Sequence, residues 1–327
     1  MNPTRRSLVS TAGLLAGLPA AARAQAAKKN ARIGYLLPAT LAGYETRLAA
    51  LRAGLRERGW VEGKNLSIEF RAADGNYERL PALAQEMVRQ KPDVLVTNGT
   101  PATLALKAAT STIPIVMTAI SDPVATGVVK SLARPDANIT GTTFFVQELV
   151  AKRLEMLREV LPKMNRAALP SNPGNTSTRT TLRDMATVAK TLRIEVRNFD
   201  VSRADEFDQA FAAMKAWGAE AVVFVDDPVL NANAARLGAL ATARRMPSNG
   251  QTAVAKGGGL MSYNINQEAL FRRAAHHIDR ILRGAKPGDL PIEQPTTFEV
   301  ILNQKAAQAL GIKFPQALLV RADEVIE

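Results

Sequence analysis

The 327-residue sequence contains no cysteine, and its only two histidines, His276 and His277, are neighbours. Without cysteine there is no disulfide, no cysteine-ligated zinc or iron–sulfur cluster, no thiol nucleophile and no lipid-modified cysteine. Aromatic residues make up 5% of the chain, and no basic run is interleaved with them. Proteins that bind nucleic acids usually combine a basic surface with stacking aromatics, so we expect no nucleic-acid partner.

Long apolar runs are also missing, since no stretch approaches the roughly 18 apolar residues that span a bilayer. The most apolar stretch near the N-terminus, residues 8–22, follows the twin arginines Arg5 and Arg6 and precedes the small residues Ala22-Arg23-Ala24. Basic residues, a weak apolar core and an A-x-A site, in that order, are typical of a bacterial export signal. We therefore predict a twin-arginine signal peptide at 1–24, cleaved near Ala24 or Ala26, and a protein exported to the periplasm.

The formal charge of +12 decreases when this signal is removed. Arg5, Arg6 and Arg23 leave with it, so 42 basic residues become 39 against 30 acidic ones, and the charge becomes +9. The remaining basic residues are spread along predicted helices. This distribution suits an exported protein that faces an anionic membrane surface.

Motifs that mark common enzymes are absent. No G-x-G-x-x-G follows a predicted strand, and the chain has neither a G-x-x-x-x-G-K-[ST] phosphate loop nor a G-x-S-x-G nucleophile elbow. His276 and His277 diverge by about 100° on a helix, so they are expected on its surface rather than around one metal ion. We expect no catalytic residue, no metal and no cofactor.

Short apolar runs alternate with amphipathic stretches from residue 31 onward, and this β-α pattern restarts near residue 147. Continuous apolar strands between helices predict parallel sheets that are covered on both faces. The predicted fold is therefore α/β, with two similar Rossmann-like lobes, a hinge and a ligand cleft between them. The predicted strands are 32–37, 66–70, 94–96, 115–117, 138–145, 166–169, 194–199, 221–225 and 257–263; the predicted helices are 44–58, 77–90, 102–109, 147–161, 177–192, 204–217, 229–244 and 267–282.

Polar loops follow several of these strands, at the sheet edge where open parallel sheets bind ligands. Three of the loops place a good helix N-cap before a proline: Thr100-Pro101, Asp122-Pro123 and Asp227-Pro228. These residues either only cap helices or, together, offer helix N-termini to a carboxylate. Asp122, Asp226 or Asp227 would then receive an ammonium group.

Many segments of residues 31–327 also match one known family in order. They include 59–66 (GWVEGKNL), 121–124 (SDPV), 138–141 (NITG), 258–263 (GGLMSY), 281–287 (ILRGAKP) and 321–327 (RADEVIE). On these residues the chain resembles ABC transporter substrate-binding proteins of the tryptophan/tyrosine type, which have the type I periplasmic-binding-protein fold.

The resemblance implies capture of a small molecule, an amino acid or a related polar metabolite, by closure of two lobes and its delivery to an ABC permease in the inner membrane. It implies lobes at 31–142 plus about 265–292 and at 143–264 plus about 296–327, and a monomer. The ligand-facing residues it implies are Thr100, Ala102, Asp122, Pro123, Asn172, Asn175, Asp227 and Tyr263. Two alternatives remain open, a periplasmic ligand-sensing protein of the same fold and an exported enzyme.

Overall fold

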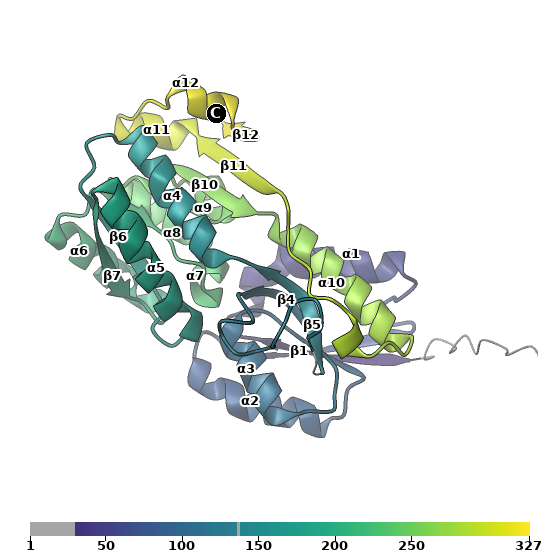
Figure 1. The fold of residues 1–327 in the computed structure, drawn as a ribbon. Coiled ribbons are helices and arrows are strands. Elements are labelled where there is room, and N and C mark those ends of the chain that lie inside the picture. The colour runs from purple at the N-terminus through teal and green to yellow at the C-terminus, as the bar shows by residue number, and fades with distance from the viewer. Residues whose placement is uncertain (1–29, 136–137) are drawn as a thin grey trace, which may run out of the picture.

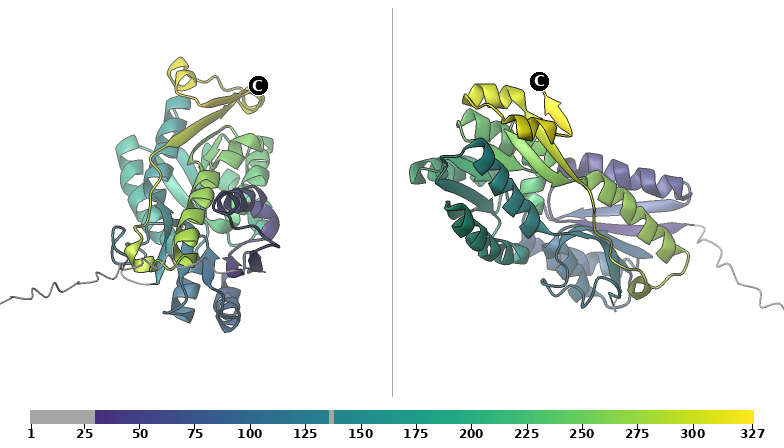
Figure 2. Two further views of the ribbon diagram at one scale, coloured as in Figure 1. Left: turned by 90° about the vertical axis from the view of Figure 1, so that its right-hand side faces the viewer. Right: turned by 45° about the horizontal axis from the view of Figure 1, so that its top comes forward.

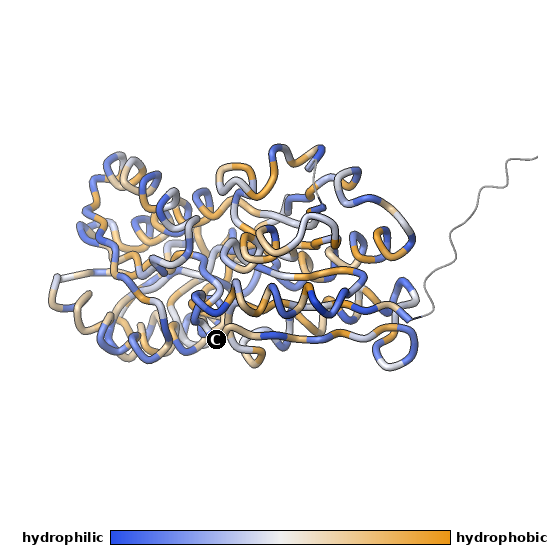
Figure 3. The backbone as a smooth tube through the Cα atoms, turned by 90° about the horizontal axis from the view of Figure 1, so that it is seen from below, coloured by the Kyte–Doolittle hydropathy of each residue, from blue (hydrophilic) through white to orange (hydrophobic). Residues whose placement is uncertain are grey.

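Two α/β lobes make up the protein in a computed structural model that describes residues 30–135 and 138–327 (Figure 1). The signal peptide predicted at 1–24 lies outside the described residues. Within the described ranges, no helix is both long and apolar enough to cross a membrane. Hydrophilic and hydrophobic stretches alternate along the surface helices (Figure 3), as expected where only one side of a helix is buried.

The first lobe is built on a five-stranded sheet with the order β2-β1-β3-β4-β5. All four strand pairs are parallel. The strands are β1 (Ala31–Leu37), β2 (Leu66–Ala72), β3 (Val94–Thr97), β4 (Ile115–Ser121) and β5 (Ile139–Phe144).

Helices cover both faces of this sheet because successive side chains of a strand point to opposite sides. Ile33, Tyr35 and Leu37 of β1 join the core beneath α1 (Glu45–Glu57) and α10 (Gln267–Leu282). Leu36 joins the opposite core, beneath α2 (Leu80–Arg89) and α3 (Thr100–Ala109). The prediction of buried parallel strands is confirmed here.

The second lobe has a seven-stranded sheet with the order β12-β11-β10-β9-β8-β6-β7. It is parallel except for the antiparallel pair β10–β11. The strands are β6 (Arg166–Ser171), β7 (Glu195–Asp200), β8 (Ala221–Val223), β9 (Ser248–Gly250), β10 (Met261–Ile265), β11 (Phe298–Asn303) and β12 (Glu324–Ile326).

One face of the second sheet packs against α4 (Val146–Val160) and α5 (Thr176–Leu192). The other packs against α6 (Phe207–Trp217), α7 (Pro228–Ala232) and α8 (Ala234–Ala243). Shorter helices complete the lobe: η3 (Ala204–Glu206), α9 (Thr252–Lys256), α11 (Gln304–Leu310) and α12 (Gln316–Val320). In the first lobe they are η1 (Leu41–Tyr44), η2 (Tyr77–Arg79) and η4 (Pro287–Asp289).

Several elements differ from the sequence prediction. The single helix predicted over 229–244 is two helices, because the chain leaves helical geometry at Asn233, whose φ is −112° and ψ 13°. The amide of Asn233 donates to the Val229 carbonyl at 2.8 Å. Strands β9, β11 and β12 were not predicted, and neither were α11 and α12. All five of these elements have only three to seven residues, which is too short for a clear periodic pattern.

The chain passes between the two sheets three times: between β5 and α4, between β10 and α10, and between η4 and β11 (Figures 1 and 2). Before its last passage it runs beside β5. There the backbone carbonyl of Glu293 accepts from the Thr143 N–H at 2.9 Å, and the Glu293 N–H donates to the Gly141 carbonyl at 3.0 Å.

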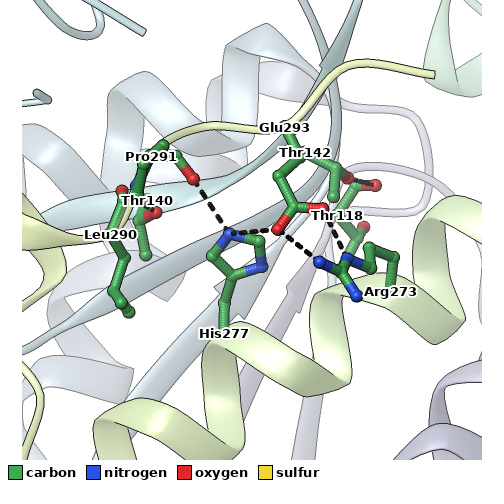
Figure 4. Close-up of polar contacts among 8 residues, drawn as sticks. All are labelled: Thr118, Thr140, Thr142, Arg273, His277, Leu290, Pro291 and Glu293. Carbon is green, nitrogen blue, oxygen red and sulfur yellow. Dashed lines mark hydrogen bonds and ion pairs between the residues drawn. The ribbon is translucent and has the colours of Figure 1, made fainter. Parts of the chain in front are cut away.

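His277 packs beneath this returning segment, so the prediction of a surface histidine is wrong at this position. Its side chain is 2% exposed, and Nε2 donates to the Pro291 carbonyl at 3.1 Å. Figure 4 shows the ring between that carbonyl and the Glu293 carboxylate, which also binds Arg273. Burial lowers the pKa of His277, which keeps the ring neutral near pH 7.

Candidate ligand-binding site

A small cavity of about 30 Å³ lies between the two lobes. Its walls come mainly from loops that follow parallel strands of each sheet, such as Asn98–Thr100 after β3 and Asp226–Pro228 after β8. Ser121 at the end of β4 and Asn175 after β6 complete this arrangement. A volume of this size holds only a few water molecules, so a larger ligand enters only if the lobes or side chains move.

Four polar atoms around this cavity are buried and have no hydrogen-bond partner. They are Asn98 Oδ1, Thr100 Oγ1, Ser121 Oγ and Asn231 Oδ1. Nine such side-chain atoms occur in the described residues, so almost half of them meet at this one place. A buried polar group without a partner costs about 1–3 kcal/mol, and a ligand that pairs with it recovers that cost.

Helix N-termini open onto the same cavity. The ten-residue helix α3 begins at Thr100, after Gly99, whose φ is +73°. Helix α5 begins after Asn175, whose side chain accepts from the Ser177 N–H at 3.2 Å. The first N–H groups of a helix have no partner within it and carry its positive dipole end, which favours a negative group.

Asp227 is the centre of a hydrogen-bond network at the interface between the lobes. Its Oδ2 accepts from the Tyr77 hydroxyl of the first lobe at 2.9 Å and from Asn175 Nδ2 at 3.0 Å. Its Oδ1 accepts from the Val229 N–H at 2.8 Å, which caps α7, and from Asn172 Nδ2 at 3.4 Å. Burial raises the pKa of Asp227, although these donors oppose the shift. Both of its oxygens are therefore already engaged.

The neighbouring carboxylate, Asp226, is paired with Arg153 from α4. The Arg153 side chain is 0% exposed, and its Nη1 contacts Asp226 Oδ2 at 2.5 Å. Arg153 also donates to the carbonyls of Phe224 and Tyr263, each at 2.9 Å. Of this pair only Asp226 lines the cavity, and because it is paired it brings no unbalanced charge there.

The cavity wall also contains Arg47 and two aromatic side chains. The Arg47 guanidinium lies 4.5 Å from the centre of the Tyr44 ring and donates to the Asn231 carbonyl of the second lobe at 3.1 Å. Phe144 and Phe271 also line the cavity. The wall therefore offers a cation next to an apolar surface.

The structure brings four of the eight predicted site residues to one place. Thr100, Asn175 and Asp227 line the cavity, and Asn172 lies behind them with its amide on Asp227. The remaining four do not line it. Ala102 packs in the core of the first lobe, and Pro123 is buried one residue beyond Asp122.

Asp122 and Tyr263 have other contacts. The Asp122 carboxylate accepts from the N–H groups of Val124 at 3.2 Å and Ala125 at 2.9 Å, so it closes its own turn. Tyr263 stacks on Phe298 with ring centres 5.5 Å apart. Whether either contacts a ligand in a more open form stays a prediction.

Sequence reasoning missed Arg47, Tyr77 and Arg153. Arg153 carried a usable signal, because it stands four residues after Leu149 and four before Leu157, on the apolar side of α4. A charge at such a position needs a buried partner. Tyr77 and Arg47 carried none, because each stands in an ordinary amphipathic segment.

No group of three or more potential metal ligands occurs in residues 30–135 and 138–327. The polar groups at the cavity are amides, hydroxyls, helix N-termini and paired charges. They are suited to bind and orient a small polar molecule.

Known proteins resemble this chain over most of its length. The sequence profile of a family described as ABC transporter substrate binding protein matches residues 42–326. A tyrosine-binding protein of Clostridioides difficile is 27% identical over 261 residues, 79% of this chain and 74% of that protein.

Two solved structures are similar in both sequence and fold. A conserved domain protein of Vibrio cholerae has a TM-score of 0.84 and 27% identity, covering 91% of this chain and 100% of that one. An ABC domain from Streptococcus pneumonia in complex with L-Trp has a TM-score of 0.82 and 26% identity, with the same coverage.

Proposed function

The chain belongs to the ABC transporter substrate-binding protein family, and we propose that it captures an amino acid or a similar small amphipathic amine for an ABC importer in the inner membrane. The observation that carries this proposal is the set of four unpartnered polar atoms around the interlobe cavity. A ligand in that cavity would supply their missing partners and would touch both lobes at once. Contacts that exist only in the closed form make ligand binding favour closure.

The chemistry of the cavity favours a ligand with a donor-rich head and a carboxylate. Asn98 and Asn231 offer acceptor oxygens, and the hydroxyls of Thr100 and Ser121 accept or donate. Arg47 and the N-termini of α3 and α5 suit the carboxylate. Phe144 and Phe271 give an apolar surface for a side chain. Two relatives, a tyrosine-binding protein and an ABC domain in complex with L-Trp, support the same ligand class.

We also propose where the protein acts and how its lobes are divided. The chain is exported by the signal predicted at 1–24 and acts in the periplasm as a monomer, without catalysis. Its lobes, at 31–142 plus about 265–292 and at 143–264 plus about 296–327, close on a hinge. Support comes from α10, which packs on α1, β4 and β5 of the first lobe, and from β11, which joins the second sheet.

Calorimetric titration with the standard amino acids tests the proposal, together with mass spectrometry of any solute that copurifies. We expect at least one amino acid to bind with micromolar or tighter affinity. If none binds and no amine-bearing metabolite copurifies, the proposed ligand class is wrong.

A pair of variants in α3 then tests the site. Thr100→Val removes an unpartnered hydroxyl, so affinity should fall about two- to tenfold while the melting temperature without ligand stays unchanged or rises. Thr103→Val is the matched control, because the buried Thr103 hydroxyl donates to the Gly99 carbonyl at 2.8 Å and does not line the cavity. It should lower the melting temperature and leave affinity unchanged. The opposite pattern would remove Thr100 from the site.

A further inference from the structure

We propose that the ligand site has a second compartment, a side chamber of about 70 Å³ that receives the hydrogen-bond-donating, cationic end of a ligand with a long side chain. The side chamber is lined by Thr46, Arg47, Asn231, Gln251, Thr252 and Glu268, among others. The inference rests on the proposed function, because it assumes an amino acid in the inner cavity. It adds to that function the chemical class of the ligand's side chain.

The side chamber adjoins the inner cavity. Arg47, Asn231 and Gln267 line both spaces, so the two meet at these side chains. On its other side the chamber shares Thr46, Thr252, Ala253 and Glu268 with an outer recess of about 710 Å³. The three spaces therefore form a series from the inner cavity to the surface.

Unpartnered acceptors mark the side chamber as a polar compartment. The Gln251 side chain is 4% exposed; its Nε2 donates to Asp226 Oδ1 at 3.2 Å, and its Oε1 has no partner. Asn231 Oδ1, which is also unpartnered, belongs to a residue shared with the inner cavity. The Gln251 oxygen, which lies at the side chamber alone, therefore calls for a group that brings N–H bonds, whereas Asn231 Oδ1 can accept from a ligand in either space.

The charges around the series favour a cation. Arg47 and Glu268 balance within the side chamber, where the Glu268 carboxylate accepts from the Thr46 hydroxyl at 2.9 Å. The outer recess adds Lys256 against Glu299, Asp323 and Glu324. Lys256 pairs with Glu324 at 3.0 Å, so carboxylates stay in excess. An ammonium or guanidinium group would move toward this negative end.

Arg47 does not close the chamber to a cation. Its Nη2 donates to the carbonyls of Gly43 at 3.0 Å and Asn231 at 3.1 Å, and its guanidinium stacks on Tyr44. Carbonyl oxygens and the ring face both attract its positive charge. The residue therefore forms a polar partition that a ligand chain passes.

L-lysine and L-norleucine test the inference, since they differ only in the terminal ammonium group. Calorimetry should show that lysine binds the full-length mature protein at least about tenfold more tightly, the effect of a hydrogen-bonded charge. Thr252 lines the side chamber but not the inner cavity, so Thr252→Trp should fill the side chamber alone. In that variant the ratio of the two affinities should fall to about one, with norleucine binding unchanged. Ala253→Leu is a smaller block in case the tryptophan variant does not fold.

Ala235→Trp is the matched control, because Ala235 lines the outer recess but not the side chamber. It should keep the preference for lysine.

Equal affinities for the two ligands in the wild type, or a preference for lysine that survives Thr252→Trp, would overturn the inference of a side chamber but not the proposed function. If Thr252→Trp slows association of both ligands equally, the chamber is only an entrance, and the inference also fails. If neither amino acid binds while a shorter one does, the inference is wrong but the proposed function stands; if no amino acid binds, both are wrong.

Discussion

The Tyr77 hydroxyl donates a 2.9 Å hydrogen bond to Asp227 Oδ2, and this bond joins the two lobes. Tyr77 lies in η2 of the first lobe, whereas Asp227 follows β8 of the second. The acceptor is a buried carboxylate, so the bond belongs to the stronger, charge-assisted class. It exists only when the lobes are together.

Tyr77→Phe should therefore weaken closure without unfolding either lobe. A hydrogen bond to a charged group contributes about 1.5–3 kcal/mol, so the Kd for the amino acid found by screening should rise about ten- to a hundredfold. Calorimetry measures this change. Tyr35→Phe is the control, since the Tyr35 hydroxyl lies 3.2 Å from Thr118 Oγ1 within the first lobe. It should lower the melting temperature but not affinity; equal affinity losses in both variants would refute the role of the Tyr77–Asp227 bond in closure.

Gly99→Ala should obstruct the contact between the lobes. A Cβ atom on Gly99 would lie 2.5 Å from Pro228 Cγ, a separation that real Cβ atoms do not show. Because the proposed ligand contacts both lobes at once, we expect at least about a tenfold loss of affinity. Small-angle scattering with ligand should show a more extended molecule than the wild type.

Gly59→Ala separates this clash from backbone strain. Gly59 has a φ of +87°, comparable with +73° at Gly99, but a Cβ there would meet nothing within 4 Å. Both alanine variants should lose about 1 kcal/mol of stability through the positive φ. If Gly59→Ala loses as much affinity as Gly99→Ala, strain rather than obstruction explains both.

Much of this arrangement could be predicted from the sequence, because parallel α/β sheets bring the loops after their strands to one edge. That rule placed Thr100, Asn175 and Asp227 around one cavity. It did not predict contacts across the interface, because Tyr77 and Asp227 belong to lobes with different sheets, and no local pattern gives the relative placement of the sheets. Nor did it distinguish the role of Asp226 from that of Asp227, since Arg153, the partner of Asp226, lies 73 residues away along the chain.

Arg153→Met tests the buried ion pair. The change leaves the Asp226 carboxylate buried without its cation, which should cost about 3–5 kcal/mol of folding stability. Adding Asp226→Asn removes the unpaired charge and should restore part of the loss. Denaturant unfolding of the single and double variants measures both values. A double variant that is as unstable as Arg153→Met would mean that packing, not charge, sets the cost.

His277 should make stability depend on pH. Burial lowers its pKa below the ordinary value of 6.5, so the unfolded chain binds a proton more readily than the folded one. The free energy of unfolding should therefore fall as the pH decreases through 6.5, and level off below the pKa of the folded state. Arg273 opposes protonation and Glu293 favours it, and both contact this site.

Urea unfolding across pH 5 to 8 measures this slope. His277→Gln keeps an amide that can donate to the Pro291 carbonyl and should remove part of the slope. His276→Gln serves as the control. Burial lowers the pKa of His276 as well, but its side chain is more exposed than that of His277, so this variant should change the slope less. A slope unchanged in His277→Gln would contradict the prediction.

The three passages of the chain between the sheets also limit how the lobes move. A single tether would let two bodies tumble separately, and two would leave a twist between them. We expect three covalent crossings to restrict the lobes to opening and shutting about one axis, so that every cycle returns the same faces to each other. The membrane partner would then meet a molecule with two well-defined outlines, shut when loaded and open when empty.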